Sequence, residues 1–119
     1  MKPSVQKLKK KESSPLERAF RYYSILSAVN SLFLTERELQ LIAFTAVKGN
    51  ISYPLNREEF CSLYKSSLPT MNNMVHKLKK QHILIGGKRG KGRKPVKVNP
   101  LISLDFNNDV VLLISLVNG

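Results

Sequence analysis

The chain has 119 residues, of which 42% are apolar, so it can bury one modest core but not two. Its formal net charge of +12 at pH 7 makes a polyanion the expected partner, either nucleic acid or an acidic membrane surface. The single cysteine excludes an internal disulfide and a zinc site built from several thiolates, and it fits a reducing compartment.

Membrane insertion and export are not expected. The longest apolar run, Val110 to Ile114, is far shorter than the roughly 20 residues that cross a bilayer. The N-terminus is basic but lacks the apolar segment of a signal peptide. We therefore predict a cytoplasmic protein, in a bacterium or in a host cell, or a virion component if it has a structural role, without a membrane partner.

The first predicted elements are a flexible arm and a helix. Residues 1–14 contain five Lys and little apolar content, which is typical of a disordered basic arm. A helix is expected at about Pro15 to Leu32, with Ser14 as its N-cap and Pro15 at its first position. Its apolar residues predict packing on the rest of the chain or on a partner subunit: Phe20, Tyr23, Ile25, Leu26, Val29 and Phe33.

A second helix is expected to begin at a capping box formed by Thr35 and Glu38. It should run to Val47 or Lys48 and stop at Gly49-Asn50, with a core stripe of Leu39, Ile42, Ala43 and Ala46. Residues 51–55 are short, alternate in polarity and contain a proline, which predicts a brief edge strand.

The third predicted helix is short. Residues 56–59 repeat the capping-box pattern and should open a two-turn helix with Phe60, Leu63 and Tyr64 facing inward. Residues 65–67 would form the turn that follows.

A fourth helix is expected with Ser67 as its cap and Pro69 in its first turn. Met71, Met74, Val75 and Leu78 recur at helical spacing and predict the buried face. The opposite face is polar and basic. Beyond it, residues 83–85 and 95–98 predict a β-hairpin around the loop 86–94, and the apolar segment 101–119 predicts a strand or a short helix that packs on the domain or on a partner.

The charge of this region is not cancelled locally. Between Lys65 and Val98 there are ten Lys or Arg and no Asp or Glu, whereas ordinary exposed helices interleave both signs. The loop 86–94 places five cations among four glycines, and glycine lets a chain enter a narrow groove. This pattern indicates a nucleic-acid-binding surface, although a solvated hairpin tip would have a similar composition.

The order of the predicted elements resembles that of winged helix-turn-helix proteins. Residues 34–39 and 66–71 open two of the helices, and residues 75–85 resemble the pattern of MarR-type regulators and of plasmid or phage replication initiators, in which a helix ending in Leu-x-x-x-x-Ile runs into the wing. Val98-Asn99-Pro100 is similar to the exit from the wing in initiator-like members, whereas His82 stands where the family usually has glycine or a small polar residue. The expected fold class is mainly α with a small β-hairpin (α+β), a winged helix-turn-helix domain at residues 15–100 with an extra N-terminal helix.

The resemblance implies that the helix from Pro69 to Gln81 enters the major groove of DNA, with Thr70, Asn72 and Asn73 at the base edges, and that the wing contacts the minor groove or the backbone. The Asn pair could instead be solvated helix residues. The expected DNA-binding residues are Lys65, Ser67, Thr70, Asn72, Asn73, His76, Lys77, Lys80, Lys88, Arg89, Lys91, Arg93 and Lys94.

Neither a catalytic residue nor a metal or cofactor site is predicted. Six of the eight acidic residues are accounted for by helix N-terminal turns or a β-turn. His76 and His82 lie about 240° apart around a helix and would not share a metal ion. Cys61 follows Phe60 and is interpreted as a small buried hydrophobe rather than a nucleophile.

The leading hypothesis is a double-stranded DNA-binding protein that acts in transcription regulation, replication initiation or packaging, in a phage, plasmid or bacterium. The alternative is a structural or assembly protein of a virion or replication complex that uses the same fold to contact protein or packaged genome. RNA is a weaker third candidate, because the exposed aromatic pair of single-strand readers is not evident. The apolar stripe from Phe20 to Phe33 and the segment from Val110 to Val117 favour a homodimer, unless both segments fold back over the helices and complete a monomer.

Overall fold

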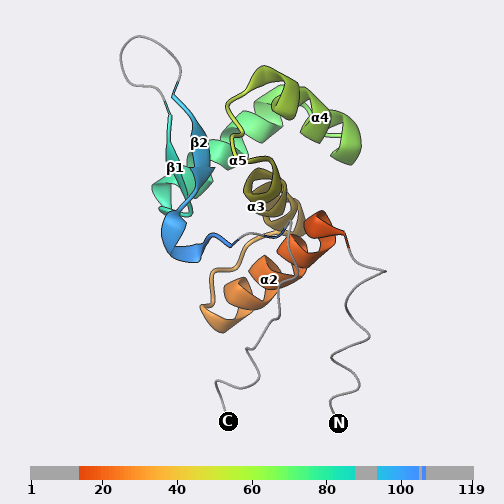
Figure 1. Ribbon diagram of the computed structural model, residues 1–119. Helices are drawn as coiled ribbons and strands as arrows, with labels where there is room; N and C mark the ends of the chain where they lie inside the picture. Colours follow the sequence, from red (N-terminus) through yellow and green to blue (C-terminus); the bar gives the residue numbers. More distant parts are fainter. Residues whose placement is uncertain (1–13, 88–93, 105, 107–119) are drawn as a thin grey trace.

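The computed structural model describes residues 14–87, 94–104 and 106. The N-terminal arm, residues 88–93 of the hairpin loop, and the run from residue 107 to residue 119 lie outside the described residues, so the expectations for them stay predictions. In chain order the elements are α2 (Pro15–Val29), α3 (Glu36–Lys48), α4 (Pro54–Tyr64), α5 (Leu68–Lys80), β1 (Leu84–Gly86), β2 (Val96–Val98) and the 3-10 helix η2 (Pro100–Ile102) (Figure 1). The expected class, mainly helical with a small antiparallel hairpin, is confirmed.

Helix α3 forms the centre of the fold, with α2, α4 and β2 packed against it. The predicted core stripe was therefore too narrow. All five residues from Leu41 to Thr45 are buried, whereas Leu39 and Ala46 are only half-buried. A helix that is covered on several sides buries more than the single face that its periodicity predicts.

The two N-terminal caps that were predicted for α2 and α3 are confirmed. The Ser14 hydroxyl accepts from the Glu17 amide at 3.1 Å, and the Thr35 hydroxyl accepts from the Glu38 amide at 3.1 Å. Each Glu carboxylate in turn accepts from the backbone amide of its N-cap residue, which completes both capping boxes. Helix α2 ends at Val29, three residues before the predicted end.

The predicted packing of α2 takes place within its own chain. Ala19 and Tyr23 are buried in the common core, and the Tyr23 hydroxyl donates to the carbonyl of Ile102 at 2.7 Å. Phe106 is also buried, with its ring 5.7 Å from that of Tyr23. The described part of the C-terminal segment therefore packs on α2. At and beyond the other end of the helix, Val29 and Phe33 are 69% and 87% exposed, so these two residues do not pack on the described part of the chain as the apolar pattern predicted.

The brief strand that was predicted at residues 51–55 is wrong, because α4 already begins at Pro54. Proline has no amide hydrogen to lose and its φ angle suits a first helical position, so it starts a helix here instead of ending a strand. The predicted cap at Asn56 is wrong for the same reason. Its side chain lies inside the first turn and donates to the carbonyl of Asn50 at 2.8 Å.

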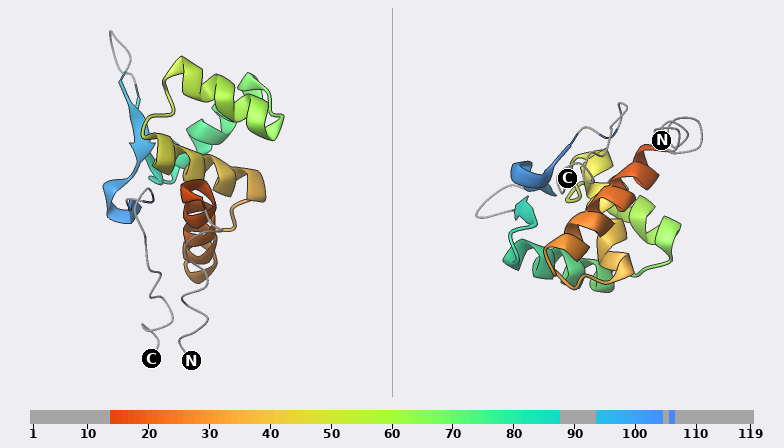
Figure 2. Two further views of the ribbon diagram at one scale, coloured as in Figure 1. Left: turned by 45° about the vertical axis from the view of Figure 1, so that its right-hand side comes forward. Right: turned by 90° about the horizontal axis from the view of Figure 1, so that it is seen from below.

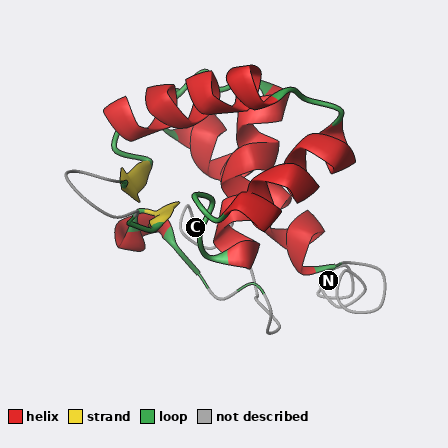
Figure 3. Cartoon of the chain, turned by 90° about the horizontal axis from the view of Figure 1, so that it is seen from above, coloured by secondary structure: helices red, strands yellow, loops and turns green. Residues whose placement is uncertain are grey.

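The hairpin is fixed to the helical body by the connection between α3 and α4. The side-chain oxygen of Asn50 accepts from the amide of Val96 at 2.9 Å and from the amide and hydroxyl of Ser52. The amide of Ile51 donates to the carbonyl of Val96 at 2.9 Å. Figure 2 shows the two strands standing at one edge of the body, and Figure 3 shows them beside the helices when the molecule is seen from above.

The pairing of the hairpin depends on a glycine. Gly86 pairs with Val96 at a φ of +107°, and a Cβ at this position would lie 2.0 Å from the carbonyl oxygen of Pro95. Both the backbone angle and the close approach of the facing strand require glycine here.

Candidate nucleic-acid interface

Helix α5 has the two faces that the sequence predicts. Met71, Met74, Val75 and Leu78 are buried, which confirms the apolar face. Ser67 caps the helix, because its hydroxyl accepts from the Thr70 amide at 3.2 Å. The candidate residues of the polar face are all exposed: Ser67, Thr70, Asn72, Asn73, His76, Lys77 and Lys80.

These candidates do not share one surface, because the helix rotates by about 100° per residue. Asn73, His76 and Lys80 lie within about 60° of one another and point directly away from the core. We call these three residues the outward strip. Asn72 lies nearer to α4 and Lys77 nearer to α3, where each has a partner.

Asn72 is bonded to a neighbouring helix. Its side-chain oxygen accepts from Arg57 of α4, and the Arg57 Nε group also donates to the carbonyl of Ile51 at 3.0 Å. The Arg57 guanidinium therefore joins α4, α5 and the segment before α4. Because its oxygen is engaged, Asn72 is less available for base recognition than Asn73.

Lys77 forms an ion pair with the buried Glu38 of α3, at 2.8 Å between Nζ and Oε2. Burial raises the pKa of the Glu38 carboxyl, but its hydrogen bonds with Lys77 and with the Thr35 backbone, together with the Lys77 charge, lower the pKa below its ordinary value. Part of the Lys77 charge is therefore neutralised inside the molecule, which makes this residue the weakest of the predicted phosphate contacts.

The junction between α5 and the hairpin contains His82, which stands where the winged-helix pattern usually has glycine or a small polar residue. His82 has a φ of +63°, in the left-handed region that glycine adopts at little energetic cost. Its carbonyl accepts from the Asn99 side chain at 2.9 Å. The turn therefore has the conformation that a glycine would give, although histidine occupies the position.

The remaining described candidates lie on either side of α5. Lys65 is exposed and ends α4 in the left-handed conformation, with a φ of +52°. Lys94 is exposed just before β2, where its carbonyl accepts from the Ser52 hydroxyl at 3.1 Å. The other four loop candidates, Lys88, Arg89, Lys91 and Arg93, lie outside the described residues.

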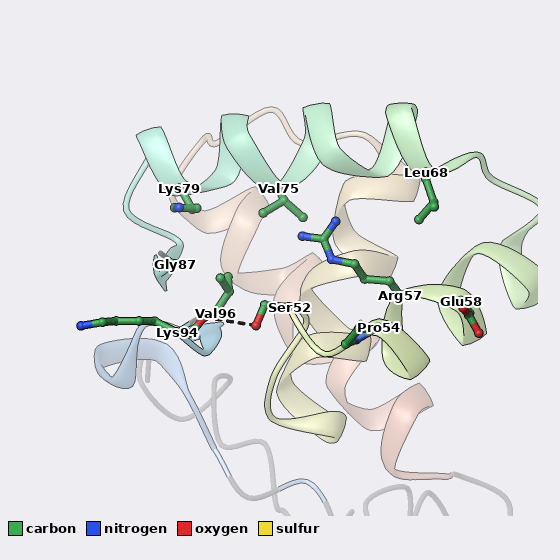
Figure 4. A pocket seen from close by; sticks show the side chains of 10 residues that line it. All are labelled: Ser52, Pro54, Arg57, Glu58, Leu68, Val75, Lys79, Gly87, Lys94 and Val96. Carbon is green, nitrogen blue, oxygen red and sulfur yellow. Dashed lines mark hydrogen bonds between the residues drawn. The ribbon is translucent and has the colours of Figure 1, made fainter. Parts of the chain in front are cut away.

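A groove of about 430 Å³ lies between α4, α5 and the hairpin (Figure 4). Its cations are Arg57, Lys79 and Lys94, of which the sequence analysis identified only Lys94. Lys79 lies four residues after Val75, so helical spacing predicts that the two side chains share one face of α5. Both side chains line the groove. Arg57 had no comparable signal, since its role depends on contacts between segments distant in sequence. The other lining residues are Ser52, Pro54, Glu58, Leu68, Gly87 and Val96.

Within the described ranges, no group of three or more His, Cys, Asp or Glu side chains is placed to hold a metal ion. Cys61 is half-buried, and its sulfur lies 3.8 Å from that of Met71. None of the described helices is both long and apolar enough to cross a membrane. Comparisons with protein-family models, with curated proteins and with solved structures found no match to this chain.

Proposed function

We propose that this chain is a double-stranded DNA-binding protein of the winged-helix type, in which α5 lies in the major groove and the basic hairpin contacts the minor groove or the backbone. The observation that carries the proposal is the outward strip of α5. It presents an amide, an imidazole and an ammonium group to solvent, on a helix that has no acidic residue. An asparagine amide can form two hydrogen bonds with adenine, and a lysine can bind a phosphate or a guanine edge.

The elements around α5 suit this role. Helix α4, a three-residue turn and α5 follow one another in the order expected of a helix-turn-helix, and the hairpin follows α5 directly, which supports the proposal. Of the two ion pairs between described residues, Lys48–Glu59 and Lys77–Glu38, neither includes Lys80 or Lys94. Lys80 in the outward strip and Lys94 before β2 are therefore available to phosphates.

Within this proposal the protein acts as a regulator of transcription, or as a factor in replication initiation or packaging. The alternative, a structural or assembly protein, has one observation in its favour. Val29 and Phe33 are 69% and 87% exposed at the end of α2, and large exposed apolar side chains are typical of protein contacts. A homodimer through this surface would bring two copies of α5 into one assembly.

Duplex affinity is expected to fall steeply with salt. With five to eight phosphate contacts, the logarithm of the association constant should change with that of the salt concentration with a slope of about −4.5 to −7. The measurement is fluorescence anisotropy with labelled duplex DNA, single-stranded DNA and RNA. Lys80→Gln should weaken binding to all duplexes alike, whereas Arg21→Gln, which removes the same charge from the exposed surface of α2, should have little effect. Failure to bind duplex at low salt would exclude DNA as the main partner and favour the assembly role.

Asn73→Ala and Asn72→Ala are expected to have different effects. Asn73→Ala should relax sequence preference by about 1–3 kcal/mol at one base pair, because its amide points away from the core, toward the DNA major groove that α5 would enter. Asn72→Ala should instead lower the free energy of unfolding by about 1 kcal/mol, because it removes the acceptor for Arg57. Binding selection with a randomised duplex and urea denaturation distinguish the two effects. Equal changes in sequence preference for both variants would contradict the assignment of Asn73 as the reader.

A further inference from the structure

The groove between α4, α5 and the hairpin combines two kinds of surface. Apolar side chains of Pro54, Leu68, Val75 and Val96 line it, while Arg57, Lys79 and Lys94 bring positive charge from three different elements. A free inorganic anion would interact with the cations but has no apolar surface to pack against these side chains. A sugar-phosphate backbone uses both, since the sugar has an apolar face and the phosphate is charged.

The cations are spread along the groove. Figure 4 shows the Arg57 guanidinium reaching toward α5 between Val75 and Leu68, while Lys79 lies at the hairpin end and Lys94 extends outward from the lower wall. An extended row of charges fits a chain of phosphates better than a single compact anion.

Gly87 leaves the space that Lys79 occupies. A Cβ at position 87 would lie 2.3 Å from the Lys79 Nζ atom, so any other residue would displace this ammonium group. Lys79 is half-buried and stands on α5 at the border between the groove and the outward strip. A DNA strand in the groove would therefore contact Lys79 while it lies next to the outward strip.

One acidic residue opposes this charge. Glu58 is exposed at the groove, so the three cations leave a net charge of +2 among the lining side chains. The N-terminus of the 11-residue helix α4 lies at the same place, and its N-cap residue, Tyr53, makes no side-chain hydrogen bond to it. The helix dipole adds partial positive charge there.

From these observations we infer that the groove seats the phosphodiester backbone of one DNA strand, with Lys79 and Lys94 binding its phosphates beside the fixed charge of Arg57. The inference rests on the proposed DNA-binding function. It adds Lys79 and Arg57 to the interface, and it identifies Glu58 as a residue that weakens binding.

The test compares salt dependence in matched variants of the full chain. Each lost phosphate contact should reduce the magnitude of the salt slope by about 0.9, so Lys79→Gln/Lys94→Gln should reduce it by about 1.8. Glu58→Gln should tighten duplex binding several-fold, whereas Glu59→Gln, on the next residue but paired with Lys48, should not. Thermal melting checks that each variant is folded. If Lys79→Gln fails to fold, the inference is tested by the salt slope of Lys94→Gln and the duplex affinity of Glu58→Gln, both of which change exposed positions.

An NMR titration separates the sources of phosphate. Duplex DNA should shift the backbone amide signals of Ser52, Gly87 and Val96, and inorganic phosphate at the same concentration should not. If the wild type binds duplex but the double variant keeps its slope and these amides do not move, the groove is not a backbone site, although the proposed function stands. Saturable shifts with inorganic phosphate alone would assign the groove to a small phosphate ligand and overturn the inference. Absence of any duplex binding by the wild type would overturn both.

Discussion

Phe60→Ala is expected to lower the free energy of unfolding by about 3–5 kcal/mol, the range typical for removing a buried phenylalanine ring. The Phe60 side chain is fully buried, and its ring lies 5.5 Å from that of Phe44 and 4.8 Å from that of Tyr64. Its removal would leave a cavity between α3 and α4 and would loosen the support of the turn before α5. Urea denaturation followed by circular dichroism measures the change.

Leu63→Ala is the matched control, because Leu63 stands on the same helix with its side chain 52% exposed. It should change stability by less than about 1 kcal/mol. The sequence predicts that Leu63 faces the core together with Phe60, so similar losses for both variants would support that prediction and contradict the exposed position of Leu63.

Asn50→Ala is expected to destabilise the protein by about 2–3 kcal/mol and to weaken duplex binding as well. The Asn50 side-chain oxygen accepts three hydrogen bonds, and without it the amides of Ser52 and Val96 lose their acceptor in a partly buried position. Binding should also weaken, because this link holds the hairpin and Lys94 beside α5. Hydrogen exchange at the Val96 amide and duplex titration report the two effects separately.

Asn30→Ala serves as the control, since the Asn30 side chain is exposed and makes one hydrogen bond, to the Leu26 carbonyl. It should leave both the Val96 exchange rate and the duplex affinity unchanged. Unaltered exchange at Val96 in Asn50→Ala would show that the hairpin does not depend on this anchor.

The features that the sequence predicted well are local. The N-cap at Ser14 and the capping box at Thr35 need only residues within one helical turn, and the two faces of α5 follow from the 3.6-residue period. The hairpin was recognisable from two short apolar segments around a glycine-rich loop. Each of these signals is contained within a short window of the chain.

The features that were missed depend on contacts between distant segments. Glu38 and Lys77 are 39 residues apart, and Arg57 and Asn72 are 15 apart, so neither pairing is visible as a local pattern. The start of α4 at Pro54 was missed because proline suits both the edge of a strand and the first turn of a helix. The outward strip could therefore be predicted only as part of a wider polar face.

The two bonds that flank α5 bear on how quickly the protein would find DNA. Arg57 holds one edge of the helix through Asn72 and Glu38 holds the other through Lys77, so the outward strip is in place before any partner arrives. Association with a preformed surface requires no conformational step, and its rate is then set by diffusion and by electrostatic attraction. The clamped helix thus favours an encounter whose speed depends on ionic strength and not on a slow rearrangement of the protein.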